Sequence, residues 1–546
     1  MKNKYALEKS FIIFSITKMI GLLVAAVTVI LCICLYLHRR FTYWVRKNVK
    51  QLDTTWILGN SDKATLRQES FADMVKRVYD ADRGERYTGI YQMSIPTLLV
   101  RDIDLLKQVC VKDFDHFVDH MTFIPDNCDP LWAKNLFALK GQRWKEMRPI
   151  LSPSFTSSKM RAMFLLMSDC AKRFTQFFAD KNDEIVELEM KDSFTRYCND
   201  VIATCAFGIE CDSLRQPNNA FYLMGKRTTN FSSLSMQLKF IALSAVPWLF
   251  ELLKIPIFDD EIKQFFYSLV NDTIKTREEK GIVRPDMIHL LMEARKGETK
   301  QEEDNVIDTG FSTVQESNAL KGKASPVEIT NQDIASQVMI FFFGGFDSVS
   351  NLMCFMAHEL AENPDVQDRL RDEIMQTTNA CNGKLTYEAL LKMKYMDMVV
   401  SETLRKWPNA VAVDRVCTKP YTVEPSKPGE IPLHLKENDV LWIPIYGLHH
   451  DYRYFPHPER FDPERFSDEN KDKIIPYTYL PFGCGPRNCI GSRFALLETK
   501  AVFFHLLTQF EIVPTNKTQI PLKLDKRSFP MVAENGFWVG LKKLNQ

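Results

Sequence analysis

An uncharged apolar run near the N-terminus sets the broadest limit on how this chain can fold. Met19 to Leu37 reads MIGLLVAAVTVILCICLYL. As a helix it would rise about 28 Å at ~1.5 Å per residue, enough to cross one hydrocarbon core. Signal peptides have apolar regions of only about 7 to 15 residues. The run therefore predicts a retained membrane anchor at 19–37, after a short N-terminal segment at 1–18.

The anchor's orientation stays open on charge alone. Four lysines precede the run, and five Lys or Arg residues follow it within residues 38–50. The positive-inside rule needs an excess of Lys and Arg on one side. This near balance gives no such excess.

The rest of the chain has the composition of an ordinary globular protein. It is 45% hydrophobic and 25% charged, with a net charge of +1, which excludes a disordered or multi-span chain. The charge balance gives no global nucleic-acid-binding surface, so no nucleic acid is expected as a partner. Thirteen cysteines, an odd number without regular spacing, do not describe a secreted disulfide scaffold and indicate a reducing compartment.

Apolar periodicity predicts one large, mainly α fold with small β-sheets (α+β). Residues 38–85 are interpreted as a linker and the start of the body, and 86–546 as the body itself, with no internal repeat. A polar stretch at 297–325 is predicted to be a flexible surface loop. The further expectations are strand character at 86–100 and 440–445, helix at 103–111, mostly helix over 155–290, and a final helix at 492–507.

Two boundaries of the long helical region can be read from the sequence. Thr330 followed by Asp333 forms a capping-box pattern that opens a helix. Helical segments continue to Lys406, because Pro408 disfavours helical geometry at Trp407.

The most specific segment is Phe482-Gly-Cys-Gly-Pro-Arg-Asn-Cys-Ile-Gly491, directly before the last helix. Its glycines allow a tight backbone close to a flat ligand, and Cys489 lies where N–H groups and the helix dipole stabilise a thiolate. That thiolate could bind haem iron. Arg487 could hold a haem propionate, and Phe482 could cover the sulfur. A lone cysteine is more often a small buried hydrophobe, but five specified positions favour a ligand. Cys484 has no matching role.

This segment fits the pattern Phe-x-x-Gly-x-Arg-x-Cys-x-Gly of the cytochrome P450 family, which the chain resembles from the anchor to the C-terminus. It looks most like microsomal insect-type members associated with xenobiotic metabolism. The resemblance implies the P450 fold, haem b (iron protoporphyrin IX) as cofactor, and Cys489 as the axial ligand of the haem iron.

Further motifs match the same family. Glu402 and Arg405 lie at i and i+3 of one helix face, and alone they would be an ordinary surface ion pair. The resemblance joins them to Arg465 in a buried structural network. It likewise implies that Trp144 and Arg148 donate to a haem propionate, where an exposed cation–π pair is the alternative.

His449 is a weaker candidate for the haem edge. A histidine that bonds only local backbone groups is its alternative interpretation.

The oxygen-activation motif is expected at Gly344-Gly-Phe-Asp-Ser348. Two mid-helix glycines each cost about 1 kcal/mol relative to alanine, so a ligand against the backbone at Gly345 would explain them; a helix-packing notch is the alternative. Asp347 would relay protons, and the Ser348 hydroxyl would bind the oxygen molecule. The family usually has threonine at this last position, so serine puts coupling efficiency in question.

The resemblance implies a monooxygenase that inserts one oxygen atom from O2 into a lipophilic substrate, as in xenobiotic detoxification. Without a G-x-G-x-x-G fingerprint in a strand-to-helix context or a P-loop, the chain has no evident dinucleotide site. Electrons are therefore expected from NADPH through NADPH–cytochrome P450 reductase, with cytochrome b5 as a further candidate donor. The alternatives are a haem–thiolate isomerase or dehydratase, and a non-enzymatic membrane-anchored haem sensor.

By position in the family, several basic residues are expected to form the docking surface for the reductase. Several apolar segments are expected to line a pocket for the lipophilic substrate. The expected basic residues are Arg143, Lys145 and Arg493. The expected pocket segments are Thr122 to Phe137, Phe346, Ala410 to Val413 and Phe529 to Val532.

The expected location is the endoplasmic reticulum membrane with the body facing the cytosol. In that orientation the sequons at Asn230, Asn271 and Asn516 would carry no glycan.

Overall fold

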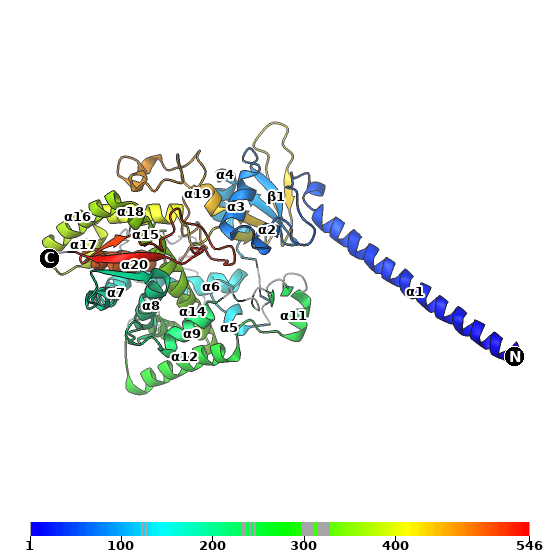
Figure 1. Cartoon of the computed structure of the whole chain (residues 1–546), viewed down its shortest axis with the longest axis horizontal. Helices are drawn as coiled ribbons and strands as arrows, with labels where there is room; N and C mark the ends of the chain where they lie inside the picture. Colours follow the sequence, from blue (N-terminus) through cyan, green and yellow to red (C-terminus); the bar gives the residue numbers. More distant parts are fainter. Residues whose placement is uncertain are drawn as a thin grey trace.

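The computed structural model shows an α-rich body from which one long helix projects (Figure 1). It describes residues 2–121, 124–125, 128–230, 233, 236, 238–239, 242–243, 247–284, 286–296, 310–314 and 328–544. The predicted surface loop at 297–325 lies outside the described residues except for 310–314.

The projecting helix is α1 (Lys2–Phe41). Its apolar part, Ser15–Phe41, has a mean hydropathy of 2.8 and is not buried by the body, as expected for a helix whose apolar surface meets lipid. The predicted anchor at 19–37 lies within it. The short N-terminal segment predicted at 1–18 is part of the same helix from Lys2 onward.

Directly after α1 the chain enters the body, within the stretch 38–85 that we interpret from sequence as a linker and the start of the body. Phe41 and Trp44 are buried in a second hydrophobic cluster beneath the main sheet. The region also contains α2 (Asp62–Thr65) and α3 (Phe71–Asp80).

The main sheet joins residues that are far apart in sequence. Its strand order is β1 (Tyr87–Gln92), β2 (Ile95–Val100), β7 (Val440–Ile443), β4 (Val413–Val416). β1 and β2 form an antiparallel hairpin, β2 runs parallel to β7, and β7 is antiparallel to β4. The pairing of β2 with β7 holds the later strands β7 and β4 against the hairpin from the N-terminal part of the body. Two smaller sheets contain β3 (Ile185–Glu189), β9 (Trp538–Lys543) and β8 (Phe510–Val513), and β5 (Tyr421–Val423) and β6 (Leu433–Leu435).

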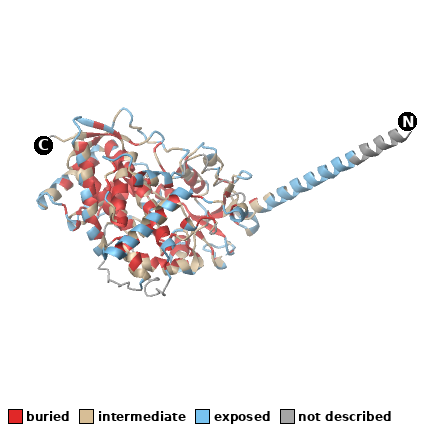
Figure 2. Cartoon of the chain, turned by 90° about the horizontal axis from the view of Figure 1, so that it is seen from below, coloured by how far each residue is buried: buried red, intermediate tan, exposed pale blue. Residues whose placement is uncertain are grey.

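A continuous apolar core lies between the long helices (Figure 2). α20 packs along α7, and α15 packs along α8 and α18. The second helix apolar enough to cross a membrane, Asn331–Glu362, is mostly buried, so it is a core helix. The bounds of these elements are α7 (Ser157–Ala179), α8 (Met190–Ile202), α14 (Asn331–Phe343), α15 (Val349–Glu362), α18 (Lys394–Lys406) and α20 (Ser492–Leu507).

Shorter helices surround this core. They are α4 (Ile103–Lys107), α5 (Pro130–Ala133), α6 (Gly141–Leu151), α9 (Ala220–Thr228), α11 (Pro247–Leu253), α12 (Asp260–Lys280), α13 (Met287–Arg295), α16 (Pro364–Ala380), α17 (Tyr387–Leu391) and α19 (Ile445–His449).

Several predicted boundaries are confirmed. The Thr330 hydroxyl accepts from the Asp333 amide at 3.2 Å and the Asp333 carboxylate accepts from the Thr330 amide at 2.9 Å, which completes the capping box. α18 ends at Lys406, and α20 spans Ser492–Leu507 as expected. The mainly α architecture with small sheets is likewise confirmed.

Candidate functional site

The cysteine-containing loop folds back tightly before α20. Gly483 and Gly485 both have positive φ, +73° and +72°, a region that favours glycine. A Cβ at Gly485 would lie 1.9 Å from the carbonyl oxygen of Cys110, so any side chain there would collide with backbone. The Cys489 amide donates to the Phe482 carbonyl at 2.9 Å, which closes the loop and places Cys489 just before the helix.

The Cys489 side chain is exposed although protein surrounds it. Burial raises the pKa of its thiol, while the Gly491 amide donating to the sulfur and the charge of Arg148 lower it. The sulfur is accessible although protein surrounds it, which means that it borders a space inside the body. A cation bound in that space would deprotonate the thiol.

A π-helical turn, η7 (Gly344–Ser348), joins α14 to α15. Gly344 is exposed in this otherwise buried helix, and a Cβ there would meet no atom within 4 Å. Such turns occur frequently at functional sites. Gly344 therefore also faces open space.

Gly345 does not fit its predicted role. A Cβ there would lie 3.0 Å from Cδ1 of Ile202 on α8, so its missing side chain makes room for helix packing. This contact favours the alternative of a helix-packing notch for Gly345, and Gly344 is the glycine at which a side chain would meet no atom.

The polar residues of the turn are held by neighbours. The Ser348 hydroxyl donates to the Gly344 carbonyl at 2.5 Å. Lys191 Nζ on α8 lies 2.8 Å from Asp347 Oδ1 and also donates to the Ser350 hydroxyl at 2.8 Å. Sequence reasoning missed Lys191, since it is 156 residues from its partner and only the packing of α8 on η7 joins them.

Two predicted arginines lie against the cysteine loop. Arg148 donates to the carbonyl and to the side-chain oxygen of Asn488, both at 2.8 Å. Arg487 donates to the carbonyls of Val118 and Leu139, at 2.8 and 2.6 Å.

The predicted aromatic residues flank the same loop. The guanidinium of Arg487 lies 4.1 Å from the ring centroid of buried Trp144. Phe482 is partly buried and packs on the main core.

A third arginine, Arg415 on β4, was missed from sequence. It is 1% exposed, donates to the carbonyl of Asp414 at 2.7 Å, and its Nε has no hydrogen-bond partner within the described residues. Burial lowers the pKa of Arg487, and the charges of Arg415 and Arg148 lower it further. The sequence signal that could have identified Arg415 is a charged residue within a short strand that begins and ends with valine (Val413–Val416).

The buried guanidiniums of Arg148, Arg415 and Arg487 show whether the site suits the charge of a haem group. Among the described residues, two carboxylates accompany them: Asp119 lies 3.7 Å from Arg487, and Asp414 lies 3.2 Å from His120. Buried charges are normally paired, so a partnerless Arg415 Nε and the excess positive charge call for an anionic group. The two propionates of haem, with a thiolate for its iron, match this donor set.

The hydrogen bonds of His449 favour its alternative interpretation, a histidine bonded to backbone groups. It is fully buried, its Nδ1 lies 3.0 Å from the Arg405 carbonyl, and its Nε2 accepts from the Leu480 amide at 2.8 Å. Burial lowers its pKa to about 3. Both ring nitrogens are therefore occupied by backbone groups, as in the alternative interpretation.

The predicted structural network consists of Glu402, Arg405 and Arg465. Arg405 makes a bidentate pair with Glu402 at 2.8 and 2.9 Å, and both side chains are completely buried. Arg465 approaches the same carboxylate at 3.4 Å, and the Asp462 amide donates to it at 2.9 Å. The three predicted residues therefore lie together, and the Glu402 carboxylate contacts Arg405, Arg465 and the Asp462 amide.

The three predicted docking residues differ in how far they are exposed. Arg143 and Lys145 are on the surface, Lys145 paired with Asp115 at 2.5 Å. Arg493 is 8% exposed and donates to the Phe155 carbonyl at 3.3 Å. Arg493 therefore offers little exposed surface to a partner.

The expected pocket segments also divide. Thr122 lies outside the described residues. Phe346 is 1% exposed and stacks on Phe342 at 5.1 Å, so it belongs to the core and not to a pocket wall. Phe529 is 65% exposed, and its ring is tilted against that of Phe71 with 4.5 Å between the centroids. Ala410, Ala412 and Val413 are partly buried.

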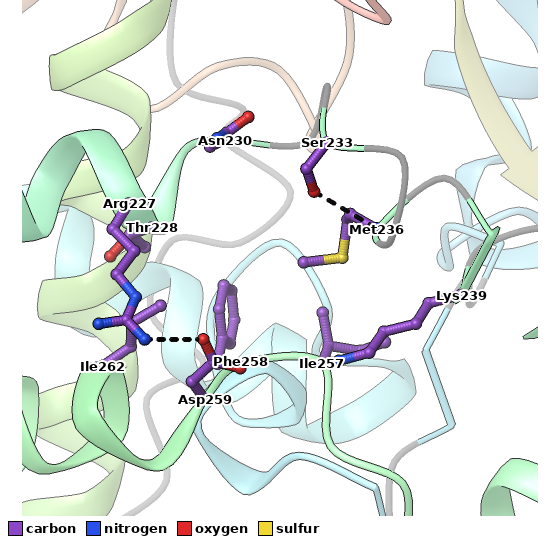
Figure 3. A pocket seen from close by; sticks show the side chains of 10 residues that line it. All are labelled: Arg227, Thr228, Asn230, Ser233, Met236, Lys239, Ile257, Phe258, Asp259 and Ile262. Atoms are coloured by element: carbon purple, nitrogen blue, oxygen red, sulfur yellow. Dashed lines mark hydrogen bonds and ion pairs between the residues drawn. The ribbon is translucent and has the colours of Figure 1, made fainter.

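A separate cavity of about 160 Å³ lies between the end of α9 and the start of α12 (Figure 3). On one side of its lining, Arg227 pairs with Asp259 at 3.0 Å. None of the predicted catalytic or cofactor-binding residues lines it. The cavity is therefore not part of the candidate site.

Comparison with known proteins agrees with this geometry. The family model for cytochrome P450 matches residues 52–538. Cytochrome P450 9e2 of Blattella germanica is 47% identical, covering 92% of this chain and 94% of the relative. Probable cytochrome P450 9f2 of Drosophila melanogaster is 45% identical over 89% and 92%, and cytochrome P450 6k1 of Blattella germanica is 38% identical over 94% and 95%.

Proposed function

The chain belongs to the cytochrome P450 family of haem-binding monooxygenases, and from that premise we propose that it inserts one oxygen atom from O2 into a lipophilic substrate with electrons from NADPH. The observation that carries the proposal is the exposed Cys489 sulfur, in a loop against which buried Arg148 and Arg487 lie. Xenobiotic detoxification is the proposed role.

In this proposal the loop and the arginines position the cofactor. Cys489 would supply the thiolate that binds the haem iron, with the Gly491 amide stabilising it. Arg148, Arg415 and Arg487 would hold the propionates as charge-assisted hydrogen-bond donors. The haem, when bound, supplies the redox chemistry that cleaves molecular oxygen.

The π-helical turn would deliver protons. The Ser348 hydroxyl can release the Gly344 carbonyl and donate toward the open space beside Gly344. Asp347, held by Lys191 at 2.8 Å, would take protons from solvent and pass them to that hydroxyl. Lys191 is thereby assigned a positioning role.

Family members generally use redox partners, and the partners proposed here are NADPH–cytochrome P450 reductase and cytochrome b5. Arg143 and Lys145 remain the proposed docking residues. Arg143 is partly exposed on α6, the helix that also presents Trp144 and Arg148 to the loop, so a donor bound there would lie close to the site.

The function is tested by turnover. The purified full-length chain, reductase, NADPH and a panel of lipophilic compounds should give oxygenated products that contain one atom from labelled O2. Conversion without NADPH would instead identify an isomerase, and haem binding without any turnover would identify a sensor.

Replacing Ser348 by alanine is expected to lower product formation per NADPH by about 10- to 100-fold. A hydrogen bond to a charged group is worth about 1.5–3 kcal/mol, which corresponds to that range in rate. The measurement is product and hydrogen peroxide per NADPH consumed. Ser336→Ala is the matched control, since Ser336 makes the same i to i−4 bond on α14, at 2.9 Å. Unchanged coupling in Ser348→Ala would remove the residue from the proton path.

The proposed location is the endoplasmic reticulum membrane with the body in the cytosol. Asn271 and Asn516 are exposed, so an oligosaccharyltransferase in the lumen could reach both sequons. In the proposed orientation, glycosidase treatment of the native protein leaves its electrophoretic mobility unchanged; a shift contradicts it.

A further inference from the structure

A short turn from the polar stretch at 297–325 packs on the body close to the cysteine loop. Of that stretch the structure describes residues 310–314. The Thr313 amide donates to the Gly310 carbonyl at 3.0 Å, which closes a four-residue β-turn. Ser312, inside this turn, is 3% exposed. A buried hydroxyl needs hydrogen-bond partners, and here they come from elements that flank the cysteine loop.

The start of the turn lies against a buried ion pair. Asp397 Oδ1 on α18 is 2.7 Å from Lys500 Nζ on α20, and the lysine side chain is 1% exposed. The second carboxylate oxygen of Asp397 accepts from the Phe311 amide at 2.9 Å. Gly310 has a φ of +134°, and a Cβ there would lie 1.9 Å from Asp397 Oδ1. Glycine is therefore required for the backbone to come this close to the ion pair.

A second contact of the turn is a closed ring of three hydrogen bonds. The Ser312 hydroxyl lies 2.7 Å from the Tyr479 hydroxyl and 2.9 Å from the Ser401 hydroxyl. Tyr479 donates to the Ser401 carbonyl at 2.8 Å, and burial raises the pKa of Tyr479, so it keeps the proton for this bond. Because a phenol has one proton to donate, Ser312 donates to Tyr479. Ser401 then donates to Ser312, and all three bonds run in one direction.

Tyr479 connects this ring of hydrogen bonds to the cysteine loop. Its side chain stacks on His449, with 5.3 Å between the ring centroids and 21° between the planes. His449 Nε2 accepts from the amide of Leu480, the next residue, at 2.8 Å. The Leu480 carbonyl in turn accepts from the Gly483 amide at 3.1 Å. The turn therefore holds the residue at which the cysteine loop begins.

The two contacts lie on opposite sides of Cys489 in the sequence. Tyr479 precedes it, and Lys500 follows it on the helix that the loop enters. We propose that the turn at 310–314 is a clamp that positions the cysteine loop, with Ser312 as its main positioning residue. The inference rests on the proposed function, because it takes Cys489 as the ligand of the haem iron. By restraining both ends of the segment, the clamp keeps the sulfur in place beside the buried arginines.

The experiment is hydrogen–deuterium exchange of the full-length, haem-loaded protein in detergent. In Ser312→Ala the ring of hydrogen bonds opens, so amides within 479–491 should exchange about 3- to 10-fold faster, the range that one lost hydrogen bond gives. Amides of α7 and α15 should keep their rates, since the opening is local. Tyr479→Phe keeps the aromatic ring and removes its hydroxyl. Adding Ser312→Ala to it should give no further increase, because both changes break the same bond.

A buried serine elsewhere gives the matched control for Ser312→Ala. Ser213 is fully buried, and its hydroxyl bonds the side chains of Asn199 and Asp200 on α8. Ser213→Ala therefore also removes a buried hydroxyl with two polar partners. It should leave exchange within 479–491 unchanged.

Gly310→Ala tests the contact with the ion pair by a different route. The added Cβ would collide with Asp397, so the turn should leave its place and give the same local increase in exchange. Gly383→Ala is the matched control, since Gly383 also has a positive φ, +76°, but a Cβ there would meet no atom within 4 Å. The second readout is the thiolate band of the reduced, carbon monoxide-treated protein, which should be lost faster on standing in Gly310→Ala than in Gly383→Ala.

Unchanged exchange within 479–491 in both Ser312→Ala and Gly310→Ala overturns the proposal. An equal increase across α7 and α15 also overturns it, because the turn would then add only global stability. Failure of the proposed function gives a different result: the exchange rates respond as expected, but Cys489→Ala keeps the thiolate band. In that case the turn positions the loop, and a different residue binds the iron.

Discussion

Replacement of Cys489 by alanine is expected to abolish the haem–thiolate absorption band of the reduced, carbon monoxide-treated protein and to lower turnover by more than about 100-fold. Loss of a residue that only orients a metal ligand costs about 10- to 100-fold, and here the ligand itself is removed. The fold should survive, because the side chain borders open space and its removal leaves no gap in the core. The free energy of unfolding is expected to change by less than about 1 kcal/mol.

A neighbouring cysteine provides the control. Cys484→Ala lies in the same loop and removes the same kind of atom, yet it should retain the thiolate band. Circular dichroism of both variants separates loss of the ligand from loss of fold. If Cys489→Ala shows the spectrum of the unsubstituted protein, another residue binds the iron and the site assignment fails.

Local signals predicted the helices well. The capping box at Thr330 and the proline after Trp407 act within one turn of the boundaries that they set. The sheet was different: β2 pairs with β7 through Thr97 and Val440, more than three hundred residues apart. No local propensity carries that register, because it depends on how the whole body packs.

The same contrast applies to the candidate site. The glycines, the arginine and the cysteine of the loop are close in sequence, so their spacing could indicate chemistry. Lys191 and Arg415 come from other elements and have no motif of their own. Gly345 and Gly344 are adjacent, and only the packing of Ile202 shows which of them borders open space.

Replacement of Glu402 by alanine is expected to destabilise the protein by about 3–5 kcal/mol. The carboxylate is fully buried between Arg405 and Arg465, and its removal leaves buried guanidinium charge without a partner. That is a large part of the roughly 5–15 kcal/mol that holds a typical domain folded. The measurement is the urea-unfolding free energy, with haem retention on heating as a second readout.

An exposed pair with the same spacing shows whether burial is the cause. Asp169 and Lys172 are also i and i+3 on a helix, 3.6 Å apart, but both are more than half exposed. Solvent screens such a pair, so Asp169→Ala should cost less than about 1 kcal/mol. Equal losses in the two variants would mean that burial adds nothing at Glu402. A large loss confined to Glu402→Ala would instead identify the desolvated arginines as the source, because they alone lose a carboxylate that water cannot replace.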